Sequence, residues 1–499
     1  MIDGINPDHS MENRYDVLVI GAGVVGNAIA RELSRYRLKT AVLEKDADVG
    51  MGTSSRNSGV IHSGIHYLPG TLRARLNVAG NDLMTDLCRD LKVRIEYLGK
   101  LTVAQDETDI ETLHRLKEQG EANGVPGLEI FDAQAMRNIQ PGVGGIAALF
   151  SPTTGIICPY GLTIALAENA RENGVDFHLG CRVEEIAANG QGFTVKTSGG
   201  RTFSSRVVVN SAGLYSDRIC KMVGITEYAI YPCRGEYLIL DKRLAGSLNV
   251  LVYPAPRKGG AGLGIHLTNT VDGNILIGPS NEYVDEADDY ACTADIIATL
   301  KREGHELLPG LSTSDFIRNF SGLRPKQTPP EIKGFKDFVI ESREDVPGFI
   351  NLVGIESPGL TCSPAIAHMV RDMVGEKLHM EENRDFKSER PGRVGFFHEL
   401  PPEEKADLVA RDPDYGEIVC RCEQITKKEV LDAIENPLGV KTIAAVKYRA
   451  RAMMGRCQGG FCLPRIVEIL QKDFGFRPED YLLSDPGSYL FSGRVRNGN

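Results

Sequence analysis

The chain has 499 residues, a length that suits two or three domains rather than one. Its hydrophobic fraction of 42% and charged fraction of 25% are ordinary for a soluble globular protein. A net charge of −10 argues against general nucleic-acid binding, which needs a basic face, but it permits a small anionic substrate in a locally positive pocket.

The composition also bears on the compartment. Met1 to Asp16 are polar and lack the apolar core of a signal peptide. No stretch approaches the ~20 apolar residues that a membrane-spanning helix needs. The eleven cysteines show no secreted-domain framework, and most of those before residue 400 stand in apolar stretches, as reduced core thiols do. We therefore expect a cytoplasmic protein that is at most peripheral to a membrane.

The N-terminal segment carries the pattern of a dinucleotide-binding unit. Asp16 to Ile20 has the length of a buried parallel strand, Asn27 to Tyr36 has helical periodicity, and Lys39 to Leu43 predicts a second strand that ends at Glu44. Between the first strand and the helix stands Gly21-Ala22-Gly23-Val24-Val25-Gly26. This complete strand–turn–helix–strand pattern with an acidic end is far more specific than a glycine triplet alone.

Each part of this pattern has an expected contact. Gly21 permits the tight turn, Gly23 lets backbone N–H groups reach a pyrophosphate, and Gly26 lets the helix and the strand pack closely. The helix N-terminus adds a positive dipole beside the phosphates. Glu44 is expected to accept the ribose hydroxyls. The pattern does not distinguish FAD from NAD.

Further segments favour FAD. Residues 52–59 form a small, hydroxyl-rich loop able to contact phosphates and to run beside a ring system. Phe349 to Val353 predicts a buried strand, and its glycine-rich exit into an apolar helix offers N–H donors to the O2 end of an isoalloxazine. Arg206 to Val209, with small residues after it, predicts one more strand.

A nucleotide domain assembled from separated segments, about 14–90, 150–225 and 330–380, is typical of large flavoproteins. The residues expected to contact FAD are Gly21, Ala22, Gly23, Val25, Gly26, Glu44, Lys45, Thr53, Ser54, Arg56, Asn57, Ser58, Gly59, Val183, Ala212, Gly213, Gly354, Glu356, Gly359, Leu360 and Thr361.

The region between the nucleotide segments predicts a substrate domain, mainly over residues 226–330. Short apolar runs bounded by Gly, Pro and Asn indicate strands that would form an antiparallel sheet over the flavin. These runs are Tyr237 to Leu240, Val250 to Tyr253, Leu263 to Leu267 and Ile275 to Ile277. Asp106 to Asn123 predicts an exposed helix, because charges occupy its outer positions.

The C-terminal part carries four closely spaced cysteines. A charged, proline-rich stretch, 384–413, predicts a linker to a small domain over residues 416–474. In this domain Thr426 to Glu429 has the form of a capping box, and Leu463 to Leu470 predicts an apolar helix. The thiols stand in two pairs, Cys420 and Cys422, then Cys457 and Cys462. We assign no role to the tail, 475–499.

The spacing and surroundings of these cysteines favour a [2Fe–2S] cluster over a zinc ion. Each iron of such a cluster takes two thiolates, so four cysteines hold one cluster. A structural zinc site uses pairs separated by two to four residues, whereas one residue separates Cys420 from Cys422. Neighbouring arginine, lysine and glycine residues offset negative charge and let backbone N–H groups approach the sulfurs. Zinc remains the alternative.

Taken together, these segments resemble a known enzyme family. Asn57 to Tyr67, Pro69 to Leu76, Ser211 to Ile219 and Gly354 to Ala367 are similar to the glycerol-3-phosphate and L-2-hydroxyglutarate dehydrogenases among the FAD-dependent oxidoreductases that include D-amino-acid oxidase. The cysteine segment resembles the domain named after bacterioferritin-associated ferredoxin. The resemblance covers the chain from Asp16 to about Leu470. It implies an α/β fold with a Rossmann-like FAD-binding domain, an antiparallel β substrate domain and a small helical [2Fe–2S] domain.

The resemblance implies the oxidation of a secondary alcohol, with hydride passing to the flavin and the hydroxyl proton to a base. His62 and His266 are the expected bases, since imidazole titrates near neutrality. Arg324 and Arg234 are expected to clamp the anionic group of the substrate, with Tyr253 as a hydrogen-bonding partner. Each of these side chains could instead be structural.

Two other functions stay open at this stage. The same fold removes hydride from C–N bonds, which would make the protein an amino-acid or opine-type amine dehydrogenase. A flavo-iron–sulfur subunit that only transfers or senses electrons is the third possibility. In the first function, electrons leave through the cluster to a protein partner or a quinone pathway rather than to oxygen.

Overall fold

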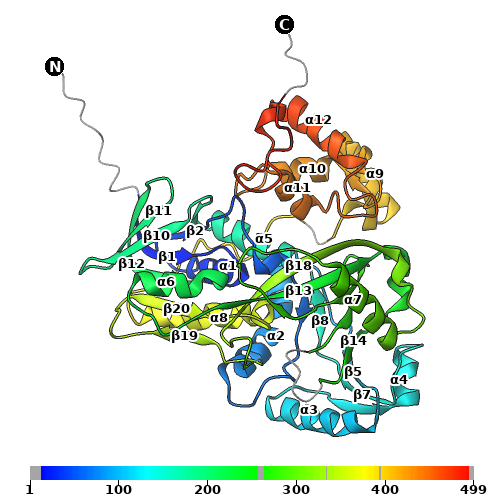
Figure 1. Ribbon diagram of the computed structural model, residues 1–499. Helices are drawn as coiled ribbons and strands as arrows, with labels where there is room; N and C mark the ends of the chain where they lie inside the picture. Colours follow the sequence, from blue (N-terminus) through cyan, green and yellow to red (C-terminus); the bar gives the residue numbers. More distant parts are fainter. Residues whose placement is uncertain (1–12, 257–262, 333, 393–394, 494–499) are drawn as a thin grey trace, which may run out of the picture.

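The computed structural model describes residues 13–256, 263–332, 334–392 and 395–493. The polar N-terminus before Asn13, the end of the tail after residue 493 and part of the expected linker lie outside the described residues. Two sheets with their helices form the body of the molecule, and a small helical domain from the C-terminal part lies against this body (Figure 1). The mixed α/β architecture that the sequence predicts is confirmed.

The nucleotide-binding sheet has eight strands from separated parts of the chain. Its centre is β1 (Arg14–Ile20), which pairs in parallel with β2 (Thr40–Leu43) and β12 (Thr202–Asn210). β20 (Phe349–Val353) continues the parallel set beside β12, and β9 (Asp176–His178) extends it beside β2. Three strands complete the sheet with antiparallel pairing: β10 (Val183–Ala188), β11 (Phe193–Thr197) and β19 (Val339–Ser342).

Alternate residues of β1 face different layers, as the two-residue period of a strand requires. Val17 and Val19 belong to the core that the sheet shares with four helices. Leu18 and Ile20 face the second core, which includes α6 (Ser216–Met222) and the β10–β11 hairpin. The helices of the first core are α1 (Val24–Leu33), α2 (Leu72–Leu91), α5 (Pro159–Glu172) and α8 (Gly359–Gly375).

The substrate-side sheet has nine strands and draws on more of the chain than the sequence indicated. Residues 226–330 supply β13 (Tyr231–Leu240), β14 (Leu251–Pro254), β15 (His266–Asn269), β16 (Ile275–Gly278), β17 (Glu282–Tyr283) and β18 (Phe316–Lys326). Residues 100–151 add β5 (Lys100–Ala104), β6 (Glu129–Asp132) and β7 (Ala147–Ser151). The sheet is antiparallel except where β14 pairs in parallel with β5. The β14–β5 pair joins segments that are far apart in the chain, so no local sequence pattern predicts it.

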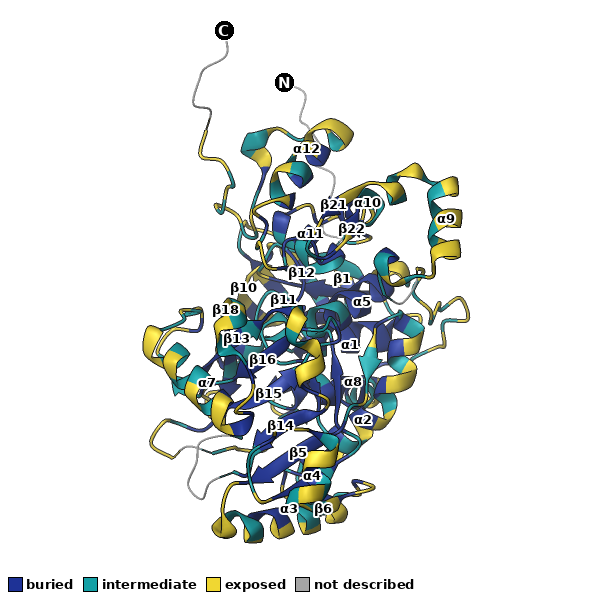
Figure 2. Cartoon of the chain, turned by 90° about the vertical axis from the view of Figure 1, so that its right-hand side faces the viewer, coloured by how far each residue is buried: buried dark blue, intermediate teal, exposed yellow. Residues whose placement is uncertain are grey.

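The remaining elements of the body are short. A three-stranded sheet contains β3 (Val60–Ile61), β4 (Ile95–Glu96) and β8 (Gly155–Ile157). The peripheral helices are α3 (Ile110–Ala122), α4 (Ala133–Ile139) and α7 (Ala294–Leu307). The expected helix over 106–123 forms as a 3₁₀ turn followed by α3. It is amphipathic, with Leu113 and Leu116 buried and its charged residues toward solvent (Figure 2).

The C-terminal domain contains α10 (Lys427–Ile434), α11 (Ile443–Ala450), α12 (Cys462–Phe474) and a hairpin of β21 (Ile418–Cys420) and β22 (Ile425–Thr426). The capping box is confirmed, because Thr426 and Glu429 exchange side-chain-to-backbone hydrogen bonds at the start of α10. The linker region is not wholly irregular: α9 (Pro402–Arg411) forms there, with no buried residue (Figure 2). Of the described helices, none is long and apolar enough to cross a membrane.

Candidate functional site

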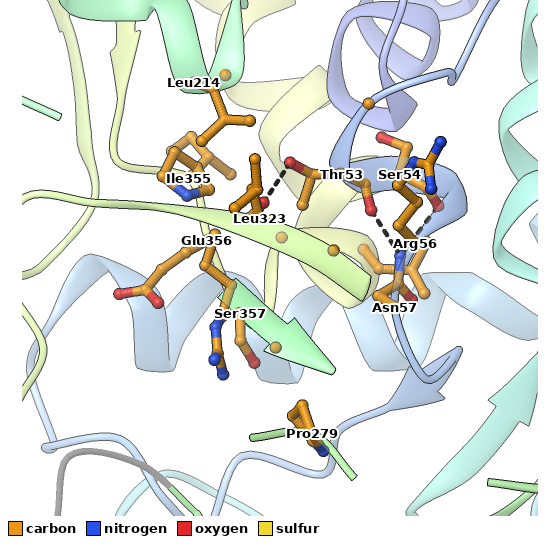
Figure 3. A pocket seen from close by; sticks show the side chains of 18 of the residues that line it. Thr53, Ser54, Arg56, Asn57, Leu214, Pro279, Leu323, Ile355, Glu356 and Ser357 are labelled. Carbon is orange, nitrogen blue, oxygen red and sulfur yellow. Dashed lines mark hydrogen bonds between the residues drawn. The ribbon is translucent and has the colours of Figure 1, made fainter. Parts of the chain in front are cut away.

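A cavity of about 1730 Å³ lies between the two sheets. Its walls come from all three nucleotide-binding segments and from strands β13, β14, β15 and β18. The close-up in Figure 3 shows Thr53, Ser54, Arg56 and Asn57 together on one loop, across from Ile355 and Glu356. The topology therefore brings most of the predicted nucleotide contacts to one cavity, together with His62, Tyr253, His266 and Arg324 of the predicted substrate contacts.

The glycine-rich turn after β1 has the close approaches that a dinucleotide site needs. Gly21 has φ of +101°, and a Cβ there would lie 2.6 Å from the carbonyl oxygen of Ser211. A Cβ on Gly26 would lie 2.0 Å from the Gly21 carbonyl oxygen, so only glycine lets α1 pack this closely. The Val24 N–H donates to Ser54 Oγ at 2.9 Å. The N-terminus of α1 and the hydroxyl-rich loop, 52–59, thus face the same end of the cavity. An anionic pyrophosphate requires this arrangement of donors.

Glu44 lies at the end of β2, on the wall of the cavity. Its carboxylate accepts hydrogen bonds from the N–H groups of Ala22 at 2.7 Å and Asp46 at 2.9 Å. Burial, with a smaller contribution from the charge of Asp46, raises the pKa of Glu44 to about 7. These two bonds fix the carboxylate in place, and its remaining lone pairs can accept ribose hydroxyls.

The middle of the cavity is bounded by the loop after residue 51, by β18 and by the start of α8. Thr53 donates its hydroxyl to the Leu323 carbonyl at 2.6 Å (Figure 3). A Cβ on Gly322 would lie 1.9 Å from the Arg56 carbonyl oxygen, so β18 can approach this loop only at a glycine. On the opposite side, Gly359 and Leu360 begin α8 and line the cavity. The positive end of this helix dipole can stabilise negative charge on a bound ring.

The two predicted bases lie on the substrate side of the cavity. His266 stacks on Tyr253 with ring centroids 3.7 Å apart, and its Nδ1 donates to the Gly264 carbonyl at 2.9 Å. Because a carbonyl only accepts, this bond leaves Nε2 as an acceptor, and Nε2 is buried with no partner among the described residues. His62 Nδ1 is likewise buried and unpartnered there. Burial lowers the pKa of each histidine to about 3, so both rings are neutral at physiological pH.

The two predicted arginine clamps have different surroundings. Arg324 lines the cavity, donates to the Ser280 carbonyl at 2.7 Å and keeps a buried Nε with no partner in the described part of the chain. Arg234 does not line it. Its side chain, 6% exposed, pairs with Glu282 at 2.6 Å and Asp289 at 2.7 Å. We therefore remove Arg234 from the substrate site, since its charge is neutralised by carboxylates within the protein.

The four C-terminal cysteines form two pairs. Hydrogen bonds connect the thiols of Cys420 and Cys462, and those of Cys422 and Cys457. The bond from Cys462 lowers the pKa of Cys420, and a backbone N–H of Phe461 lowers that of Cys457. Within the described residues, no three His, Cys, Asp or Glu side chains are placed to hold one metal ion. Two pairs of thiols suit the two irons of a cluster better than they suit a single zinc ion.

The backbone around these thiols is held in an unusual conformation. Five non-glycine residues of the described chain have φ in the left-handed region. Four of them flank the cysteines: Gln424, Arg451, Met453 and Gln458. Such strain persists only when the surroundings enforce it, and it turns successive N–H groups toward one point. The N–H groups of Glu423, Met453 and Gly459 accordingly reach the sulfurs.

Comparison with known proteins agrees with this geometry. Residues 16–373 match the family described as FAD dependent oxidoreductase. The chain belongs to this family. Residues 418–472 match the BFD-like [2Fe-2S] binding domain. The two cofactors that the sequence predicts, FAD and a [2Fe–2S] cluster, are thereby confirmed, and the zinc alternative is set aside.

Relatives of this FAD-dependent oxidoreductase are named as glycerol 3-phosphate dehydrogenases, L-2-hydroxyglutarate dehydrogenases and glycerol 3-phosphate oxidases. A protein of Caloramator mitchellensis named glycerol 3-phosphate dehydrogenase is 40% identical over 97% of this chain and 99% of its own. The mitochondrial L-2-hydroxyglutarate dehydrogenase of Arabidopsis thaliana is 33% identical over 72% of this chain and 83% of its own. Among solved structures, L-alpha-glycerophosphate oxidase from Mycoplasma pneumoniae superposes with a TM-score of 0.70 at 28% identity, covering 76% of this chain and 98% of that one.

Most of the residues expected to contact FAD line the cavity. They are Gly21, Gly23, Val25, Glu44, Lys45, Thr53, Ser54, Arg56, Asn57, Ser58, Val183, Ala212, Gly213, Glu356, Gly359 and Leu360. Five others do not line it and lie behind its wall: Ala22, Gly26, Gly59, Gly354 and Thr361. Thr361, for example, is fully buried and accepts a hydrogen bond from the His62 N–H at 3.0 Å. The Thr361 side chain therefore faces the protein interior. We expect Thr361 to affect the site only by fixing the position of His62.

Sequence reasoning missed two residues beside the predicted bases. Lys100 at the start of β5 is fully buried, and its Nζ lies 3.1 Å from His66 Nε2. His66 lines the cavity and belongs to the same motif as His62. A lysine inside an otherwise apolar strand was the available signal, because lysine is almost never fully buried without a reason.

The oxidoreductase body holds the cysteine domain through buried ion pairs. Arg449 of α11 bonds to Asp48 at 2.6 Å and to Glu168 at 3.0 Å. Arg451 bonds to Glu423 at 2.7 Å within the cysteine domain and to Asp272 at 2.5 Å in the turn between β15 and β16. These contacts place the cysteine pairs in a fixed position relative to both parts of the body.

Proposed function

We propose that this protein is a dehydrogenase that oxidises the secondary alcohol of a small anionic substrate and passes the electrons on to an acceptor other than oxygen. The observation that supports this most strongly is His266 on the wall of the FAD cavity, whose ring is oriented by Gly264 and Tyr253 and whose Nε2 has no partner among the described residues. An oriented acceptor nitrogen on the cavity wall meets the geometric requirement for removal of a hydroxyl proton. Relatives named for oxidation of alcohols agree with this chemistry.

Two cofactors and two kinds of side chain would share the work of this reaction. Bound FAD would supply the two-electron acceptor, and the [2Fe–2S] cluster would carry single electrons onward. Arg324 would bind and orient the anionic group through charge-assisted hydrogen bonds. His266, or His62, would take the hydroxyl proton at its free ring nitrogen. The low pKa of both rings keeps them unprotonated before the reaction begins.

We favour sn-glycerol 3-phosphate as the substrate. The relative that bears this name aligns over nearly the whole chain, cysteine domain included, whereas the L-2-hydroxyglutarate dehydrogenases align over about three quarters of it or less. L-2-Hydroxyglutarate is the second candidate, because the Arabidopsis thaliana enzyme named for it is 33% identical over 72% of this chain. For either substrate, we propose a protein partner or a quinone pathway as the acceptor, since an oxidase would not need the cluster.

Anaerobic mixing tests this proposal directly. The purified holoenzyme is combined with glycerol 3-phosphate, L-2-hydroxyglutarate, lactate or amino acids while flavin absorbance is followed. We expect bleaching by glycerol 3-phosphate, followed by the EPR signal of the reduced cluster in the same sample. Bleaching by amines alone would instead indicate an amine dehydrogenase. If no small anion bleaches the flavin and only a partner protein reduces it, the protein is an electron-transfer subunit.

Replacement of the two histidines distinguishes the base from a structural ring. We expect H266N to lower the rate of flavin reduction by about 10²- to 10⁴-fold, the usual contribution of general base catalysis, with FAD still bound. H62N is measured beside it, and the larger loss identifies the base. H114Q serves as the control, because His114 is exposed on α3. Losses below threefold in both variants would rule out His62 and His266 as the base.

A further inference from the structure

The strongest unexplained feature near the site is a buried amine without a counter-ion. Lys100 is fully buried, its Nζ contacts His66, and no charged partner acts on it within the described part of the chain. Its surroundings are the ring of Tyr253, whose centroid is 4.8 Å away, and His66 at 3.1 Å. An unpaired buried cation is expensive, so some other group must compensate it when the site is in use.

The titratable groups around this amine are all neutral or positive. His66 contacts it directly, His62 and His266 lie close enough to interact electrostatically with it, and Arg115 of α3 adds positive charge beside His66. Burial lowers the pKa of Lys100 to about 7, and it holds the pKa of His66 well below its ordinary value. This corner of the cavity is therefore positive when Lys100 is protonated, and no acidic side chain offsets it in the residues described.

The contact between Lys100 and His66 fixes what the histidine can offer. A protonated amine only donates, so His66 Nε2 accepts from it and the ring proton resides on Nδ1. His66 itself lines the cavity, whereas Lys100 lies behind it. The pair thus combines a ring N–H donor with a positive charge directly behind the ring.

We propose that His66 and Lys100 form the subsite for the anionic end of the substrate, a phosphate or a distal carboxylate. His66 is the contacting donor, and Lys100 is a positioning residue that acts through it as the counter-charge. Arg324 reaches the same cavity from β18 and would complete the anion site. This inference rests on the proposed function, because it assumes an anionic substrate.

The test is K100M, which removes the charge but keeps an unbranched chain of similar length. We expect KM for glycerol 3-phosphate to rise about tenfold or more, the usual effect of losing a charge-assisted bond, with kcat changed less than threefold. The inhibition constant of inorganic phosphate should rise in parallel. FAD content and the cluster spectrum should stay at wild-type values. K196M is the control, since Lys196 is an exposed residue of β11 paired with Glu185.

The pH profile separates this role from a structural one. Lys100 is charged below its pKa and neutral above it, so wild-type KM should rise as pH increases through about 7. K100M should have a high KM without this rise, and ionisation of the substrate itself is common to both proteins. H66Q combined with K100M should add little to either single change.

The following outcomes decide whether His66 and Lys100 form the anion subsite. An unchanged KM in K100M, or a fall in kcat with KM constant, would overturn the subsite. A wild-type enzyme that no anionic alcohol reduces would instead refute the proposed function, and phosphate inhibition could then no longer support the subsite. If K100M does not fold, two single variants, K100R and H66Q, replace it. In that case a K100R enzyme with near-normal KM supports the proposal, and an H66Q enzyme with normal KM contradicts it.

Discussion

R451M should loosen the cysteine domain and slow the delivery of electrons to the cluster more than it slows flavin reduction. Arg451 joins Glu423, which directly follows Cys422, to Asp272 and Asn274 in the turn between β15 and β16. All three guanidinium contacts are buried or nearly so. Removing Arg451 takes the cation from Asp272, whereas Glu423 keeps Lys242 at 2.6 Å, and breaking such a network costs about 3–5 kcal/mol.

Two measurements report this loss. Limited proteolysis should cut the exposed region around α9 faster, because the domain no longer stays docked. Rapid-freeze EPR after substrate addition should show slower reduction of the cluster, while stopped-flow bleaching of FAD stays near the wild-type rate. R465M is the matched control: its ion pair with Glu417 is at the surface, where the loss is about 1 kcal/mol or less. Unchanged proteolysis and unchanged cluster reduction would mean that Arg451 does not hold the domain.

R324A should raise KM for the substrate by about 100-fold, with FAD still bound. The guanidinium lines the cavity and has a buried Nε without a partner among the described side chains, so it has bonding capacity left for an anion. Loss of a hydrogen bond to a charged group costs about 1.5–3 kcal/mol, and loss of the ionic attraction adds to this. R324K should recover only part of the affinity, because an ammonium group cannot form a two-point contact.

The comparison with Arg234 makes this result specific. R234M should lower the melting temperature, since Glu282 and Asp289 lose their partner, but should leave KM within about threefold of wild type, the range of a residue without substrate contact. Steady-state kinetics and thermal unfolding of R324A and R234M measure these two effects. An R324A enzyme with unchanged KM would remove Arg324 from the site, and a large KM effect in R234M would restore the earlier assignment.

The sequence predicted those features whose cause is local. The turn at Gly21 and the packing at Gly26 follow from short-range sterics, and the observed distances agree with them. The capping box at Thr426 is equally local. The pairing of β14 with β5 could not be predicted, because it joins residues 251–254 to residues 100–103 and depends on how the two sheets assemble.

The same reasoning explains the errors at the site. Nothing close to Arg234 or Arg324 in the sequence shows which of the two side chains faces the cavity. Only the folded chain brings Glu282 and Asp289 to Arg234 and leaves Arg324 free to face the cavity. Lys100 was overlooked for a related reason, since its significance comes from His66, thirty-four residues away in the chain.

The C-terminal tail also sets the size of the cysteine-containing folding unit. Tyr481 is buried against α12 and Phe476, the Ile443 N–H bonds to the Leu482 carbonyl, and the Leu490 N–H bonds to the Tyr481 carbonyl. The region that matches the [2Fe-2S] binding domain ends at residue 472, before any of these contacts. An isolated fragment that stops there would expose apolar surface on α11 and α12. The independently stable unit should therefore extend to about residue 490, so a transplanted electron-transfer module needs this added segment.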